Sequence, residues 1–113
     1  MRRVAGAVIL PPEVPQGIAD HLVVEVRDVS MLDAPSKVVA QIRYQAVPIE
    51  PGARIPFELD VPDAPPGGTL AVRAHLARDP GETVRRGDGL STASLELPGS
   101  GSIVGLDVPV SLV

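Results

Sequence analysis

The sequence predicts an all-β protein, an antiparallel β-sandwich of about seven strands that forms a single domain over residues 1–113. Three observations support this fold. Apolar and polar residues alternate with the period of two that is typical of strands, and no helix-length segment has apolar residues spaced every 3.6 positions. Most of the 13 prolines and 11 glycines fall between the alternating segments, where they mark turns.

Clusters of turn residues such as PPEVPQG and PDAPPGG separate the expected strands. A strand with one polar face must bury its other face, and because no helix is expected, the covering layer is a second sheet. Pro56 and Pro109 cannot donate a ladder hydrogen bond, so we expect them at sheet edges or bulges. The expected strands lie near Arg2–Leu10, His21–Val29, Lys37–Ala46, Ile55–Val61, Thr69–Arg78, Leu90–Leu97 and Ile103–Leu112.

The apolar face of each strand follows from the alternation, because successive side chains of a strand point to opposite sides. In the first strand, Val4, Gly6, Val8 and Leu10 share one side. The later strands are expected to contribute Leu22, Val24, Val26, Ile55, Phe57, Leu59, Val61, Leu70, Val72, Ala74, Leu76, Val104, Leu106, Val108, Val110 and Leu112.

The composition argues against several functions. The formal net charge is −4 and Lys37 is the only lysine, so we expect no binding of nucleic acid. Tyr44 and Phe57 are the only aromatic residues, which leaves no stacking surface for bases. The absence of cysteine excludes disulfides, thiolate catalysis and cysteine-ligated metals. No apolar run approaches the roughly 20 residues that a membrane-spanning helix needs. We also predict no cofactor.

The N-terminal segment MRRVAGAVIL imitates the charged and apolar regions of a secretory signal. The apolar run is followed by PPEVPQG instead of a clear small-residue cleavage site, and it alternates well as a strand. We therefore interpret the segment as a strand. On this interpretation the chain as given has no signal peptide and is expected in the cytoplasm.

The residue types that commonly perform catalysis do not form a recognisable site. His21 and His75 lie on the charged side of their strands without a third ligand at metal-binding spacing, so we expect both to face solvent. Ser100 lies between two expected strands, whereas a nucleophile elbow joins a strand to a helix. The carboxylates fall at strand ends and turns, where solvated groups are usual. We predict no enzyme activity.

The segment Arg85–Ser91 contains Arg-Gly-Asp, a tripeptide that integrins bind, and acidic residues nearby could contribute to a calcium site. Calcium needs about six to eight oxygen ligands, and Asp79, Glu82 and Asp88 supply too few. A hairpin that turns at Asp88 and Gly89 accounts for the same residues. We therefore expect a turn.

The loop between the second and third strands is our candidate for contact with a partner. Its Asp, Pro and Ser residues favour tight turns. Met31 and Leu32 either pack onto the end of the sandwich or present apolar surface to another protein. The candidate partner-binding residues are Ser30, Met31, Leu32, Asp33, Ala34, Pro35 and Ser36.

The order of these segments resembles a known family. VAGAV comes first, ADHLVVEVRDVSMLDAPSKVVAQ follows, and IPFELDV and LAVRAHL come later. The pattern is densest from Val26 to Gln41 and resembles the bacterial YbaY/YscW lipoprotein family, which includes pilotins (secretin chaperones) of type III secretion.

The resemblance implies a β-sandwich, no enzyme activity, and a location in the bacterial cell envelope or periplasm through an acylated N-terminal cysteine. For pilotins it also implies binding to a secretin subunit. This sequence has no cysteine to accept a lipid. Either it is a trimmed domain, or this member works inside the cell.

Together these observations predict a non-enzymatic protein-binding module, a pilotin-like or chaperone-like accessory of bacterial envelope or secretion assembly. The expected partner is another protein, bound at an exposed sheet edge or in an apolar groove. Two alternatives stay open. One is a β-sandwich that binds a small apolar ligand in its cavity, and the other is a structural accessory domain.

Overall fold

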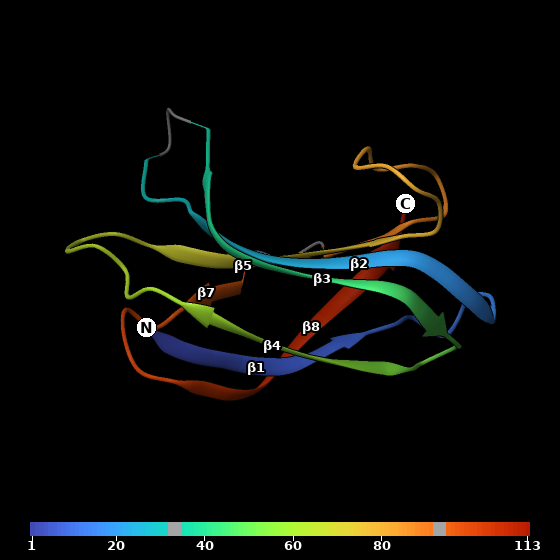
Figure 1. The fold of residues 1–113 in the computed structure, drawn as a ribbon, viewed down its shortest axis with the longest axis horizontal. Coiled ribbons are helices and arrows are strands. Elements are labelled where there is room, and N and C mark those ends of the chain that lie inside the picture. The colour runs from blue at the N-terminus through green and yellow to red at the C-terminus, as the bar shows by residue number, and fades with distance from the viewer. Residues whose placement is uncertain (32–34, 92–94) are drawn as a thin grey trace.

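The computed structural model describes residues 1–31, 35–91 and 95–113. These residues form eight β-strands and no helix, which confirms the all-β prediction (Figure 1). None of the described residues belongs to a helix able to span a membrane. The strands are β1 (Arg2–Ile9), β2 (Gly17–Asp28), β3 (Lys37–Ile49), β4 (Arg54–Val61), β5 (Leu70–Ala77), β6 (Gly89–Ser91), β7 (Leu95–Leu97) and β8 (Ile103–Leu112).

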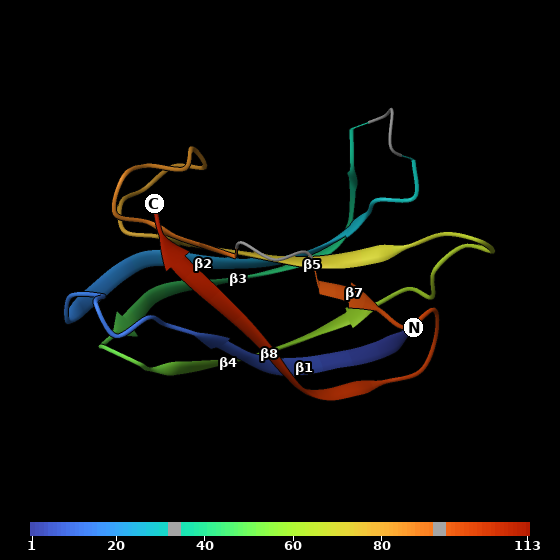
Figure 2. The same ribbon diagram turned by 180° about the vertical axis from the view of Figure 1, so that it is seen from behind.

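The strands form one mixed sheet instead of the predicted pair of antiparallel sheets. They follow the order β3-β2-β5-β6-β8-β1-β4, with β7 beside β5. The sheet folds over into two layers, one containing β2, β3 and β5 and the other containing β1 and β4, while β8 crosses obliquely from one layer to the other (Figures 1 and 2). The result is a nearly closed, barrel-like sheet in which β1 and β8 are parallel.

The long strand β8 connects the two layers because it changes partners along its length. Its first part, Ile103–Pro109, pairs with β1, and its last part, Val110–Leu112, pairs with β6. Pro109 lies at this change of partner and not at a sheet edge, so its missing N–H falls where one ladder ends and the next begins. Pro56 does lie on an edge strand, β4, as expected.

The ends of the sheet order, β3 and β4, meet along the seam of the barrel. Here the backbone N–H of Glu58 donates a hydrogen bond to the hydroxyl of Tyr44, at 3.2 Å. At the C-terminal end of β3, Val47 and Ile49 are buried and extend the strand three residues beyond its predicted end. The prediction stopped at Ala46, where the backbone has a positive φ of 51°.

The core confirms most of the predicted apolar faces. Leu22, Val24 and Val26 are completely buried, and Val4 and Val8 face them from the other layer. The prediction for Val104 is wrong, because this side chain is 81% exposed. The next residue, Gly105, has a φ of 72°, and the register between β1 and β8 shifts at this point. This irregularity reverses the alternation, which simple period-two counting misses.

Gly6 is required by the close approach of β1 to β8. A Cβ atom at this position would lie 1.9 Å from the backbone carbonyl oxygen of Leu106. Real atoms do not approach so closely, so a side chain here would force the two parallel strands apart.

The predicted strand Leu90–Leu97 corresponds to β6 and β7, and residues 92–94 lie outside the described residues. Both pair with the same side of β5, β6 near His75 and β7 near Leu70. The backbone N–H of Ala74, between these positions, donates to the hydroxyl of Ser91 at 2.9 Å. The hydroxyl of Ser91 therefore adds a side-chain hydrogen bond between β6 and β5.

Candidate binding face

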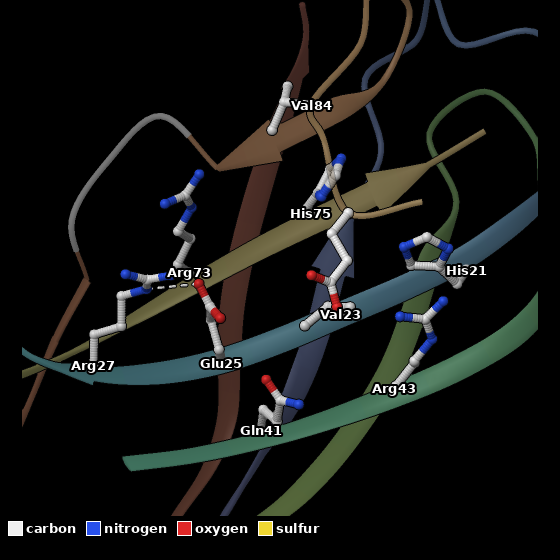
Figure 3. A pocket seen from close by; sticks show the side chains of 10 residues that line it. His21, Val23, Glu25, Arg27, Gln41, Arg43, Arg73, His75 and Val84 are labelled. Carbon is white, nitrogen blue, oxygen red and sulfur yellow. Dashed lines mark hydrogen bonds and ion pairs between the residues drawn. The ribbon is translucent and has the colours of Figure 1, made fainter. Parts of the chain in front are cut away.

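The outward-pointing side chains of β2, β3 and β5 form a polar surface, which we call the outer face. Because strand residues alternate, the residues between the buried Leu22, Val24 and Val26 point away from the core. Pairing across the strands places them in two rows, Gln41–Glu25–Arg73 and Arg43–Val23–His75. Together with neighbouring residues, these rows line a pocket of about 270 Å³ (Figure 3).

One wall of the pocket comes from residues 78–88, which connect β5 to β6. They fold back over the end of the outer face where His75 lies (Figure 1). Glu82 and Val84 of this connection line the pocket. The connection makes its tight turn at Arg86 and Gly87, where the N–H of Asp88 donates to the carbonyl of Arg85 at 3.0 Å. The predicted turn therefore exists, but it is centred two residues earlier than expected.

Asp88 holds this connection in place. Its carboxylate is 1% exposed and accepts three hydrogen bonds, from His75 Nε2 at 2.9 Å and from the backbone N–H groups of Arg85 and Arg78 at 2.9 and 3.1 Å. Burial raises the pKa of this carboxyl, but the three hydrogen bonds outweigh burial and hold the pKa below its ordinary 3.8. A carboxylate buried in this way does not present an Arg-Gly-Asp signal to a receptor.

The two histidines were predicted to face solvent, and this prediction is wrong. His21 is 1% exposed and its Nδ1 lies 2.6 Å from the Asp20 carboxylate, while His75 is bound to Asp88. Their rings lie edge to face, with centroids 6.2 Å apart. The alternation correctly assigned both to the outer face, but the tertiary structure covers that face at this end. Within the described ranges, no group of three His, Asp or Glu side chains is placed to hold a metal.

The arginines of the outer face differ in how their charge is compensated. Arg27 donates from Nε to Glu25 at 2.7 Å and from a terminal nitrogen to the hydroxyl of Ser36 at 2.9 Å. Figure 3 shows Arg43 and Arg73 approaching the pocket from the strands on either side of β2. In the part of the chain that the structure describes, neither arginine forms an ion pair.

The predicted partner loop is anchored at both of its ends. Ser30 donates from its N–H to Asp28 at 2.9 Å and accepts from the N–H of Thr69 at 2.8 Å. The bonds from Ser30, with the positive charge of Lys37, lower the pKa of the half-buried Asp28 carboxyl. Ser30 therefore has a structural part in the loop.

The other residues of the predicted loop divide into two groups. Met31 is 72% exposed and Pro35 is exposed, whereas Ser36 is joined to the pocket through Arg27. Leu32, Asp33 and Ala34 lie outside the described residues. The prediction that this loop contacts a partner stays a prediction.

Sequence reasoning missed the pocket itself. The available signal was the charged residues that alternate along β2 and β5, such as Glu25, Arg27 and Arg73. Such a pattern is normal for a solvated strand face, and only the fold of residues 78–88 turns part of that face into a pocket.

Comparison with known proteins identifies the family. The YscW family profile, described as type III secretion system lipoprotein chaperone, matches residues 1–86. No curated protein matches. Among solved structures, the chain resembles an alternative pilotin from the type II secretion system of Vibrio cholerae, with a TM-score of 0.69, 17% sequence identity, and coverage of 97% of this chain and 96% of that one. This structural likeness shows the shared fold, and the profile match shows that the chain belongs to the YscW family of secretion chaperones.

Proposed function

We propose that this protein is a pilotin-like accessory of a bacterial secretion system and that it acts by binding a secretin subunit. The observation that carries the proposal is the YscW match over residues 1–86. The pilotin-like fold, which extends over nearly the whole chain, supports the same conclusion. We further propose that the protein works in the cell envelope, where secretins assemble.

The geometry favours protein binding over binding of a small apolar ligand. The space between the layers is filled by buried aliphatic side chains such as Leu22, Val24 and Val108. The pocket on the outer face is lined mainly by charged and polar groups, which suit a polar contact with a protein better than an apolar ligand. The lining of the pocket therefore does not favour a small apolar ligand.

Capture of a secretin tests this function directly. The purified chain is immobilised and exposed to a secretin encoded in the same genome. In the native host, deletion of the gene is expected to reduce the assembled secretin in the outer membrane, and fractionation is expected to place the protein in the envelope. A secretin that neither binds the chain nor depends on it for assembly overturns the proposal.

The same capture assay tests the predicted loop. A Met31→Ala variant removes the exposed thioether without touching the hydrogen bonds that anchor the loop, so a contact there should weaken capture several-fold. Unchanged capture by this variant would assign the contact to another part of the surface.

A further inference from the structure

We propose that the outer-face pocket binds an acidic side chain of a partner protein, from a segment in which that residue is flanked by an aliphatic one. This inference rests on the proposed function only in taking the partner to be a protein. It adds the chemistry of the segment that is recognised and names the residues that recognise it.

Arg43 and Arg73 give the pocket uncompensated positive charge. They reach the pocket from β3 and β5, and in the described residues neither has a carboxylate partner. In the other layer, by contrast, Arg3 pairs with Glu58 and Arg54 pairs with Asp107. A guanidinium group that faces a pocket without an ion pair is suited to bind a carboxylate through two parallel N–H···O hydrogen bonds.

Within the lining of the pocket, the arginines outnumber the glutamates. Glu25 is engaged by Arg27, and Glu82 is exposed at the wall, so three arginines face two glutamates in the lining. Two further carboxylates lie beside the histidines. Asp88 is fully engaged by its three donors and Asp20 lies against the His21 ring.

The size and the lining of the pocket suit a side chain of a partner protein. At about 270 Å³ the pocket lies at the lower limit of the roughly 300–1,000 Å³ of most small-molecule sites. Val23 at its floor and Val84 at its wall are half-buried, and both offer aliphatic surface next to the arginines. An acidic residue next to a Val, Leu or Ile side chain satisfies both parts of the lining.

Charge argues against an anionic membrane as the occupant. Headgroup binding generally uses clusters of about four to eight basic residues, more than the three arginines that line this pocket.

The test compares two peptides, Ac-Val-Glu-Val-Glu-Val-NH₂ and its glutamine counterpart Ac-Val-Gln-Val-Gln-Val-NH₂, in titrations of the ¹⁵N-labelled full chain at low salt. We expect the glutamate peptide to bind at least about tenfold more tightly and to shift the amide signals of Val23, Glu25 and His75. We also expect 0.5 M NaCl to abolish most of this difference.

Variants define the site. In the double variant Arg43→Gln/Arg73→Gln, the preference for the glutamate peptide over the glutamine peptide should disappear. The control variant Arg54→Gln, which changes the other layer, should keep this preference. Circular dichroism confirms that each variant is folded. Several outcomes overturn the inference: no binding of the glutamate peptide, equal binding of both peptides, a preference that survives the double substitution, or arginine-dependent binding of vesicles of phosphatidylglycerol without peptide binding.

The inference and the proposed function can fail separately. If the double variant captures the secretin as well as the wild type does, the pocket is not the contact and the proposed function stands. If the glutamate peptide binds at the pocket but no secretin is captured, the pocket chemistry stands and the partner is a different protein.

Discussion

Replacement of Asp88 by alanine removes the buried carboxylate that fastens residues 78–88 to the outer face. Three donors lose their acceptor, namely the ring of His75 and the backbone N–H groups of Arg78 and Arg85. A hydrogen bond to a charged group contributes about 1.5–3 kcal/mol. Because Arg78 and Arg85 are exposed residues whose N–H groups regain water partners when the connection opens, we expect a total loss of about 3 kcal/mol.

Urea denaturation followed by circular dichroism measures this loss. Hydrogen exchange measures its local part, because the amide of Gly87 donates to the carbonyl of Val113 and should lose protection when the connection opens. Asp79→Ala is the matched control, since Asp79 is an exposed carboxylate in the same connection and its removal should change stability by less than about 0.5 kcal/mol. An Asp88→Ala variant within about 0.5 kcal/mol of the wild type would refute the reasoning.

The same carboxylate predicts a pH dependence of stability. The folded protein holds the pKa of Asp88 below 3.8, so the ionised form stabilises the fold fully above that value and loses its effect as the pH falls through the lower, folded pKa. The difference in unfolding free energy between wild type and Asp88→Asn should therefore shrink below about pH 4. A difference that stays constant between pH 6 and pH 2 would show that ionisation of Asp88 does not matter.

Three further substitutions test the fold. Gly6→Ala should lower stability by about 3 kcal/mol because its Cβ meets a backbone oxygen, whereas Gly99→Ala, whose Cβ meets nothing within 4 Å, should leave the melting temperature nearly unchanged. Ser30→Ala should cost about 1 kcal/mol by urea denaturation, because the N–H of Thr69 loses its acceptor. Arg2→Met should leave stability unchanged or raise it by about 1 kcal/mol, because Nε and one terminal nitrogen of this buried guanidinium have no hydrogen-bond partner among the described residues. A clear drop in melting temperature for Arg2→Met, or none for Gly6→Ala, would contradict these expectations.

Much of the strand structure could be predicted because alternation is a local property. The side chains of Leu22, Val24 and Val26 are apolar at every second position, and burial of one face follows directly. The same reasoning failed at Val104, because the backbone irregularity at Gly105 reverses the sides of the strand and leaves no mark in the alternation itself.

The candidate site was less predictable for a different reason. Glu25, Arg43 and Arg73 belong to three strands, and nothing in their local sequences says that they meet around one pocket. Asp88 had the sequence context of a turn residue, yet its burial depends on contacts with His75 and Arg78, which are 13 and 10 positions away. Such contacts are fixed by the path of the chain and not by neighbouring residues.

By itself, the sequence of this protein determined an all-β fold, the apolar faces of most strands, and a resemblance to the YbaY/YscW family, because periodicity and segment order are properties of the chain alone. The tertiary structure alone decided that β1 and β8 run parallel, that one mixed sheet nearly closes on itself, and that residues 78–88 cover the outer face. Strand pairing depends on which distant segments bury their apolar faces together. The alternation of apolar and polar residues does not identify these segments, because it is the same whichever strand is the partner.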